Sequence, residues 1–227
     1  MKPLGVVCVS GGMDSAVTAA IGAATHRLAF LHANYGQRTE RKELACFEGL
    51  ADRMGAEARL VIDLTTLRAI GGSSLTDPKI PVREGAPEAG GIPTSYVPFR
   101  NAHLLAAATS WAETLGADAL FIGAVWEDSS GYPDCRPEFY RAFEEVIRQG
   151  TRPDTHLRIE TPLIRLTKEQ IVRKGAELQV PFELTWSCYQ SEDAACGACE
   201  SCMLRRRGFA AAGVVDPIPY RAPSDLL

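Results

Sequence analysis

Apolar runs alternate with amphipathic stretches along the first part of the chain. Leu4–Ser10 is a Val-rich apolar run that ends at a Gly-Gly pair, as buried parallel strands often do. Further strands are expected at Leu28–Tyr35 and Ala58–Asp63, with helices at Asp14–Thr25 and Glu40–Met54 between them. A strand–helix–strand order is typical of right-handed βαβ crossovers. The pattern therefore predicts an α/β fold built on a Rossmann-like, doubly wound parallel sheet.

The alternation stops between residues 64 and 98. This segment is rich in glycine and proline and shows little periodicity. Loops longer than about 12–15 residues in compact domains are usually functional lids or disordered segments. We favour a lid over a disordered connection because apolar residues such as Leu75, Ile80 and Val82 recur in the segment.

Regular elements resume after residue 100. A capping-box pattern, Thr followed three residues later by Gln, opens one of the expected helices, and Pro opens another. We expect a main α/β domain over residues 1–180 and a small cysteine-containing module with a last helix over residues 181–227. The elements expected in this half are helices at Asn101–Leu115, Pro137–Gly150, Thr167–Leu178 and Ser201–Ala212 and a strand at Ala119–Gly123.

Composition and charge are those of an ordinary globular protein. Of 227 residues, 46% are hydrophobic and 23% charged, which excludes a disordered or fibrous chain. The 24 Lys and Arg against 28 Asp and Glu give a net charge of −4, which argues against stable binding of tRNA or DNA. A short basic run, Arg205–Arg207, is interpreted as a surface or subunit contact. No apolar window of about 18 residues predicts a membrane span or signal peptide, so a cytoplasmic protein is expected.

A glycine-rich loop, SGGMDS, lies between the first strand and the first helix. Open α/β sheets bind ligands at this edge, where glycines let main-chain N–H groups face an anion beside a helix N-terminus. The loop has no Lys, so it is not a Walker A site and would need Mg²⁺ for charge balance. It resembles the SGGxDS signature of the PP-loop ATP pyrophosphatase superfamily, although a capped tight turn is the simpler alternative. The residues expected to hold the ATP phosphates are Ser10, Gly11, Gly12, Asp14 and Ser15.

Further polar side chains stand at a strand end or at a helix start. Tyr35, Gln37 and Arg38 follow the second strand and are candidates for ATP contacts, although polar residues at a strand end are common. Arg100 precedes a helix and could reach a phosphate or simply pair with a carboxylate. Lys168 falls in the first turn of a helix, where its charge opposes the helix dipole. That position suits either a solvated surface or a phosphate contact.

The segment GAVWEDSSGYPDCRPEF at residues 123–139 follows a strand directly and is dense in acidic, aromatic and Gly/Pro residues. Carboxylates can accept two hydrogen bonds from a guanine-type base, Tyr can stack on it, and Arg can hold a carboxylate bidentately. A charged, solvated connection is the alternative. Cys135 is a weaker candidate for a nucleophile because no His is near it in sequence. The residues proposed to bind substrate are Asp128, Tyr132, Asp134 and Arg136.

Four of the seven cysteines form a C-x7-C-x2-C-x2-C pattern near the end of the chain. In a reducing compartment such a cluster predicts a metal site rather than disulfides. Four thiolates suit tetrahedral Zn²⁺ and leave no open position, so one structural zinc per chain is expected. An iron–sulfur cluster is the main competitor, and unliganded thiols are a third alternative. The expected ligands are Cys188, Cys196, Cys199 and Cys202.

Taken in order, these motifs resemble those of the 7-cyano-7-deazaguanine synthase family of the queuosine pathway. The resemblance covers essentially the whole chain, and the SGYPDCRPEF block is far more specific than the phosphate loop. The segments that carry it are SGGMDS, NYGQR, SSLT, GGIPTSYVPFRN, GAVWEDSSGYPDCRPEF, TPLIRLTKEQI and the cysteine module.

The resemblance implies an adenine nucleotide alpha hydrolase fold of the PP-loop type and a nitrile-forming ligase. Its substrates would be 7-carboxy-7-deazaguanine, ammonia and ATP with Mg²⁺, and its products a nitrile, AMP and pyrophosphate. Asp14, Lys168 and Arg100 would then act in catalysis, the last two by stabilising charge at the α-phosphate. Residues 64–98 would close over the adenylate, and the family likeness suggests a homodimer.

Three other functions fit part of the pattern. A PP-loop enzyme of tRNA thiolation would share the phosphate loop, but it would need a tRNA-binding module and a persulfide-carrying Cys. A zinc-ribbon binding module without chemistry would share the cysteines. A paralogue that activates a different carboxylate would share nearly everything.

Overall fold

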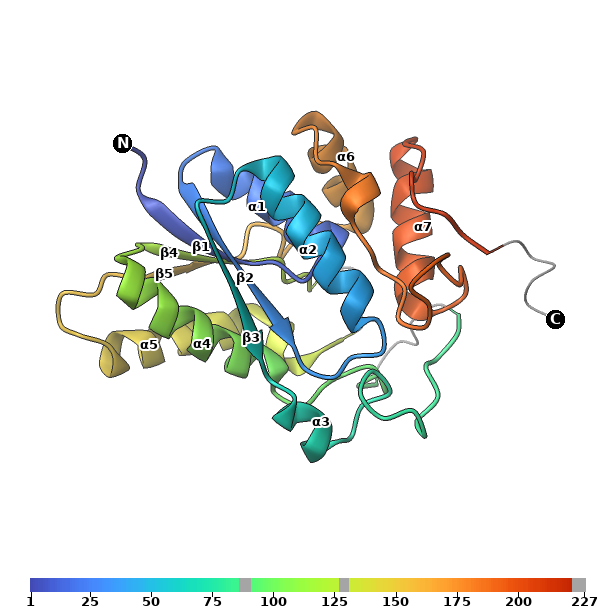
Figure 1. The fold of residues 1–227 in the computed structure, drawn as a ribbon, viewed down its shortest axis with the longest axis horizontal. Helices are drawn as coiled ribbons and strands as arrows, with labels where there is room; N and C mark the ends of the chain where they lie inside the picture. The colour runs from blue at the N-terminus through green and yellow to red at the C-terminus, as the bar shows by residue number, and fades with distance from the viewer. Residues whose placement is uncertain (86–90, 127–130, 222–227) are drawn as a thin grey trace.

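The computed structural model describes residues 1–85, 91–126 and 131–221. In this part of the chain five parallel strands form one sheet in the order β3-β2-β1-β4-β5 (Figure 1). The strands are β1 Leu4–Cys8, β2 Arg27–Asn34, β3 Ala58–Asp63, β4 Ala119–Ile122 and β5 Arg158–Glu160. The order runs outward from β1 in both directions, which confirms the predicted doubly wound α/β fold.

Apart from the short α3, the helices agree with the predicted ones to within a few residues at their ends. They are α1 Met13–Ala23, α2 Glu40–Met54, α3 Thr66–Ile70, α4 Arg100–Leu115, α5 Pro137–Gly150, α6 Lys168–Glu177 and α7 Glu200–Ala212, with short 3₁₀ turns η1 Pro133–Cys135 and η2 Phe182–Leu184. The capping box at the start of α6 is confirmed, because Thr167 and Gln170 exchange side chain–backbone hydrogen bonds. The sequence did not predict α3 and β5, which are too short to show a periodicity.

The two faces of the sheet bury two separate cores. In β1 and just beyond it, Val7 and Val9 join a cluster formed with α1, α2, α6 and α7. Val6 and Cys8 point to the opposite face and join a cluster formed with α4 and α5. Figure 1 shows these two groups of helices on opposite sides of the sheet. Alternate strand residues therefore face different helices, as the side-chain period of a strand requires.

Glycines allow close packing beside α6. A Cβ at Gly208 of α7 would lie 2.8 Å from Lys168 Cβ and 3.1 Å from its carbonyl carbon. The last helix therefore rests directly against the first residue of α6.

Within the described residues, no helix has both the length and the apolar character that crossing a membrane requires.

We expect Gly175→Ala to destabilise the protein. A Cβ at this position in α6 would overlap Phe182 Cζ and lie 2.8 Å from Val17 Cγ2, both of them core atoms. Overpacking of this kind costs about 1–3 kcal/mol, which denaturant unfolding would measure. Gly150→Ala is the matched control because nothing lies within 4 Å of its new methyl group. Equal unfolding midpoints for the two variants would contradict the packing described here.

Candidate active site

The phosphate loop joins β1 to α1 in a conformation that depends on glycine. Gly11 has φ +84°, and a Cβ there would lie 2.5 Å from the Glu43 carbonyl oxygen. Gly12 N donates to Ser10 Oγ at 3.2 Å, and Ser15 Oγ donates to Gly12 O at 2.9 Å. The N-terminus of α1 has no side-chain cap, so its backbone N–H groups remain available to an anion.

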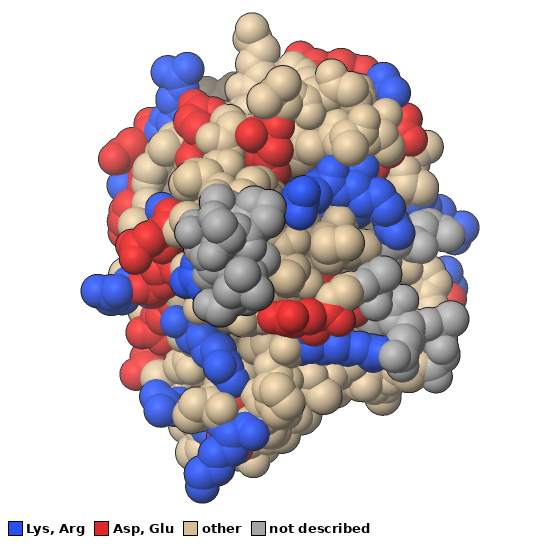
Figure 2. All heavy atoms as spheres, turned by 90° about the vertical axis from the view of Figure 1, so that its right-hand side faces the viewer, with Lys and Arg blue, Asp and Glu red and all other residues tan. Residues whose placement is uncertain are grey.

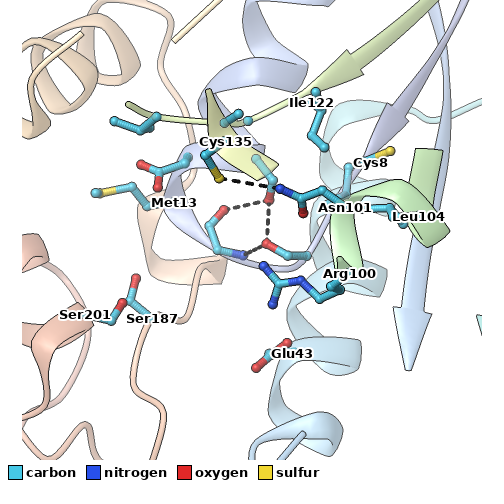
Figure 3. A pocket seen from close by; sticks show the side chains of 18 of the residues that line it. Cys8, Met13, Glu43, Arg100, Asn101, Leu104, Ile122, Cys135, Ser187 and Ser201 are labelled. Atoms are coloured by element: carbon cyan, nitrogen blue, oxygen red, sulfur yellow. Dashed lines mark hydrogen bonds between the residues drawn. The ribbon is translucent and has the colours of Figure 1, made fainter. Parts of the chain in front are cut away.

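A cavity of about 260 Å³ opens beside this loop, at the carboxyl ends of β1 and β4 (Figure 3). This is where the strand order reverses direction, the usual binding position in an open α/β sheet. The predicted site residues that line it are Ser10, Gly12, Asp14, Ser15, Tyr35, Arg100, Tyr132 and Lys168. The structure therefore brings together residues that are far apart in the sequence.

Lys168 and Asp14 form an ion pair in the cavity wall. Lys168 Nζ donates to Asp14 Oδ2 at 2.6 Å, and its side chain is only 9% exposed. Each residue stands in the first turn of its helix, Asp14 in α1 and Lys168 in α6. The acidic group of α1 thus offsets the unfavourable placement of a cation at the N-terminus of α6.

Arg100 is held against Tyr35 on another part of the wall. Its Nη1 donates to Tyr35 Oη at 3.0 Å, and its guanidinium carbon lies 5.2 Å from the centre of the Tyr35 ring. The residue before it, Phe99, adopts a left-handed conformation with φ 58°. Such a conformation is rare for a bulky residue, and here it directs the chain into α4 at the arginine.

Gln37 and Arg38 do not line the cavity. Gln37 accepts from Tyr35 N at 2.8 Å and donates to Glu43 Oε2 at 3.1 Å. Arg38 donates to the backbone oxygens of Ser74, Asp77 and Ile80, and so holds part of the 64–98 segment. Contact of either residue with ATP stays a prediction.

The candidate substrate-binding residues are distributed differently from the prediction. Tyr132 lines the cavity, and its hydroxyl donates to Ser95 Oγ at 2.9 Å. Asp134 lies behind the wall, where Asn101 N, at the start of α4, donates to Asp134 Oδ2 at 3.0 Å. Arg136 is exposed and donates to Pro133 O at 2.9 Å. Asp128 lies outside the described residues.

We expect Asp134→Ala to act chiefly on stability. The substitution removes the acceptor for the buried Asn101 N–H at the first turn of α4, a loss of about 1–3 kcal/mol. We expect a lower melting temperature and an unchanged Michaelis constant for 7-carboxy-7-deazaguanine, the substrate that the sequence motifs imply. A raised Michaelis constant at unaltered stability would instead make Asp134 a contact for the substrate.

Cys135 lines the cavity but is poorly suited to act as a nucleophile. Burial raises the pKa of its thiol to about 11, so the thiolate is scarce at neutral pH. Asn101 Nδ2 donates to its sulfur at 3.5 Å. The thiol therefore serves as a protonated part of the wall.

Several cavity residues were not among the predicted ones. They include Glu43 on α2 and a group from the C-terminal part of the chain: Trp186, Ser187, Tyr189, Ser201, Leu204 and Arg205. The module that holds the cysteines thus forms one wall of the same cavity. Sequence offers little signal for this, because it depends on how α7 packs against α6.

The interpretation of Arg205 as a surface residue is wrong. It is 1% exposed and binds Asp216 through two hydrogen bonds, of 2.8 and 2.9 Å. Its Nη1 also donates to Thr185 Oγ1 at 2.8 Å and to Ser187 Oγ at 3.3 Å. A buried charge needs such partners, and here they join α7 to the chain that lines the cavity. Figure 2 shows basic and acidic side chains interspersed on the face that carries α7.

The four predicted ligand cysteines come together and are buried. One ligand atom from each of Cys188, Cys196, Cys199 and Cys202 lies within 4.8 Å of the others. Tetrahedral Zn²⁺ with Zn–S bonds of about 2.3 Å places its sulfurs about 3.8 Å apart, so the cluster fits such an ion. Backbone N–H groups of Gln190, Cys196 and Cys199 donate to the sulfurs, which favours thiolates.

The cysteine module also contacts several described residues of the 64–98 segment. Glu84 forms an antiparallel bridge with Cys199, and Gly85 N donates to Ala198 O at 2.9 Å. Ser95 Oγ donates to Glu200 Oε2 at 3.3 Å and accepts from the cavity residue Tyr132. Cys199 thus directly precedes Glu200, whose contacts reach the cavity through Ser95 and Tyr132.

Comparisons with solved structures support the fold. The chain aligns over 99% of its length with 48% of a 4-thiouridine synthetase solved in complex with RNA and bound ATP, at a TM-score of 0.55 and 17% identity. At this identity the likeness bears on the fold alone.

Curated relatives match nearly end to end. A 7-cyano-7-deazaguanine synthase of Chloroherpeton thalassium is 57% identical over 95% of this chain and 96% of the relative. The Chlorobaculum parvum protein of the same name is 55% identical over 98% of both chains, and that of Acidobacterium capsulatum is 55% identical over 95% of both. The family model for the queuosine biosynthesis protein QueC matches residues 5–213. The chain belongs to the QueC family of queuosine biosynthesis proteins.

Proposed function

We propose that this protein converts 7-carboxy-7-deazaguanine and ammonia to 7-cyano-7-deazaguanine with ATP, in queuosine biosynthesis. The observation that carries the proposal is the Lys168–Asp14 pair beside an uncapped glycine-rich loop, in a chain of this family. The loop could bind the phosphates of ATP, the carboxylate could hold a cation, and the ammonium group could stabilise charge where the mixed anhydride forms.

The chemistry requires activation because a carboxylate is a poor acyl donor whose leaving group would be oxide. Attack of the substrate carboxylate on the α-phosphate of ATP gives an acyl-adenylate and releases pyrophosphate. Ammonia then displaces AMP and forms the amide. A second ATP adenylates the amide oxygen, and loss of AMP with a proton from nitrogen gives the nitrile.

The roles of the loop residues follow from their positions. Ser10, Gly12 and Ser15 line the cavity. Together with Gly11 and the start of α1, they would bind the pyrophosphate part of ATP through backbone N–H and hydroxyl groups. When bound with ATP, Mg²⁺ would neutralise phosphate charge, and the Asp14 carboxylate is suited to hold it. Lys168 and Arg100 would stabilise the negative charge that grows at the α-phosphate.

The remaining assignments are part of the same proposal. Tyr132 and Tyr189 in the cavity wall are suited to stack on the deazaguanine, and Tyr35 to contact ATP. Asp128 and Arg136 stay candidates for recognising the base, whereas Asp134 is expected to act by holding Asn101 at the start of α4. We propose Zn²⁺ for the four cysteines, with a structural role, and a cytoplasmic homodimer that forms no stable complex with nucleic acid.

The decisive experiment is incubation of the purified protein with 7-carboxy-7-deazaguanine, ATP, Mg²⁺ and ammonium. Mass spectrometry should detect the nitrile, with two AMP released for each nitrile formed. Release of ADP and inorganic phosphate without AMP would rule the proposal out. AMP release that needs a different carboxylate, or bulk tRNA, would instead identify a paralogue or a tRNA-modifying enzyme.

A further inference from the structure

The proposed reaction needs a group that can accept a proton from nitrogen. Ammonium predominates over ammonia at neutral pH, yet only ammonia has the lone pair that attacks an acyl-adenylate. A side chain that removes one proton inside the cavity would therefore raise the fraction of competent nucleophile where it is needed.

Few cavity residues can take up this proton. Burial raises the pKa values of the Cys8 and Cys135 thiols to about 12 and 11, so both stay protonated. Burial likewise raises the pKa values of the three tyrosines in the wall, Tyr35, Tyr132 and Tyr189. The described wall contains two carboxylates, and that of Asp14 is already paired with Lys168. The other carboxylate is that of Glu43.

The Glu43 carboxylate is fixed in position on α2. Thr39 Oγ1 donates to its Oε1 at 2.7 Å, and Gln37 Nε2 donates to its Oε2 at 3.1 Å. Each carboxylate oxygen keeps a second lone pair, so the group can still accept from a ligand. Figure 3 shows it in the cavity wall on the side of Arg100.

We propose that Glu43 is the base that takes a proton from ammonium in this cavity. The inference rests on the proposed function. The ammonium N–H bond breaks, its proton moves to a Glu43 oxygen, and ammonia remains. The nitrogen lone pair then forms the C–N bond with the acyl carbon while the C–O bond to AMP breaks. One nitrogen proton ends on the departing phosphate oxygen, and Glu43 later returns its proton to water.

The surroundings of Glu43 suit this role. Burial raises the pKa of its carboxyl to about 7, against the lowering effect of its two hydrogen bonds and of Arg100 on α4. Glu40 on the same helix adds to the rise, and Tyr35 and Cys46 are the other titratable groups close by. The carboxylate form therefore predominates only above about pH 7, and it holds its proton more strongly than an exposed Glu would.

The test compares Glu43→Gln with wild type in two separate steps. Exchange of labelled pyrophosphate into ATP reports adenylation of the acid, and amide formation at fixed total ammonium reports the nitrogen step. We expect normal exchange in the variant and amide formation reduced about 10²-fold at pH 7. Glu48→Gln, at an exposed position of the same helix that pairs with Arg59, should match wild type in both steps.

The pH profile separates a base from a structural residue. The rate of amide formation by the wild-type protein should rise with pH up to about pH 7, as the Glu43 carboxyl loses its proton. Above that pH the rate should stay level, because the carboxylate and ammonium are then present together. The Gln variant should instead rise with free ammonia across the whole range, so its deficit shrinks at high pH. Glu43→Asp keeps a carboxylate, so its rate of amide formation should be lower than that of wild type but should show the same level region above about pH 7. This variant keeps the test decisive if Glu43→Gln fails to fold.

Two results would overturn the inference. One is equal loss of exchange and amide formation in Glu43→Gln, which would make the residue a nucleotide or acid ligand. The other is a variant profile parallel to that of wild type. Failure of the wild-type protein to release AMP with the acid would instead overturn the proposed function, so the two failures are distinguishable.

Discussion

Lys168→Met should abolish most of the adenylation activity while leaving a folded protein. The ammonium group lies 2.6 Å from Asp14 beside the phosphate loop. In the proposed reaction, negative charge would develop there as the α-phosphate is attacked. Loss of one such electrostatic donor typically lowers turnover about 10²–10³-fold. AMP release with 7-carboxy-7-deazaguanine and pyrophosphate exchange should fall together, because both contain the adenylation step.

The control is Lys174→Met, at an exposed position of the same helix where the lysine pairs with Glu177 at 3.2 Å. It should keep wild-type turnover. Because Lys168→Met leaves the Asp14 carboxylate without its partner, the double variant with Asp14→Asn should recover stability but not activity. Wild-type exchange in Lys168→Met would exclude a role for the lysine in catalysis.

Cys199→Ser should cost both the metal and the fold of the C-terminal module. Its ligand atom belongs to the buried group of four, and its backbone pairs with Glu84. Metal binding contributes about 10–16 kcal/mol in small zinc domains, so loss of one ligand should cost more than about 4 kcal/mol. At roughly 2–4 °C per kcal/mol, the melting temperature should fall by at least roughly 8 °C.

Metal analysis by plasma emission should find one zinc per wild-type chain and much less in the variant. Cys8→Ala is the control, since it removes a buried thiol from β1 but no ligand and should leave the metal content unchanged. Bound iron together with absorbance of visible light would instead identify the metal as an iron–sulfur cluster. A Cys199→Ser protein with full metal content and an unaltered melting temperature would refute the assignment of this ligand.

The sequence predicted the sheet because its strands are short apolar runs separated by amphipathic helices. It also predicted a glycine-rich turn at residues 10–15 and the grouping of the four cysteines, since both depend on local spacing. Binding of ATP by the first and of a metal by the second stay predictions. The short elements α3 and β5 carry no periodicity and were missed. A domain boundary near residue 180 stays a prediction.

The wall of the cavity was harder to predict because it depends on tertiary packing. Glu43 lies on an amphipathic helix, where a carboxylate normally belongs to the solvated face. For Arg205 a signal did exist, since it stands three residues after the buried Cys202 and four before the buried Phe209. That spacing puts the three on one face of α7, and the guanidinium carbon does lie 5.0 Å from the centre of the Phe209 ring.

The contact of Gly208 with Lys168 bears on how this protein could be recombined with its relatives. A chimera that takes its cysteine module from another family member needs an α7 with a glycine at the position of Gly208. It also needs an arginine that can bind Asp216, as Arg205 does here. Without the glycine, a side chain on the transplanted helix would press on Lys168, the residue that pairs with Asp14. We therefore expect the cysteine module and α6 to be exchangeable only as a matched pair.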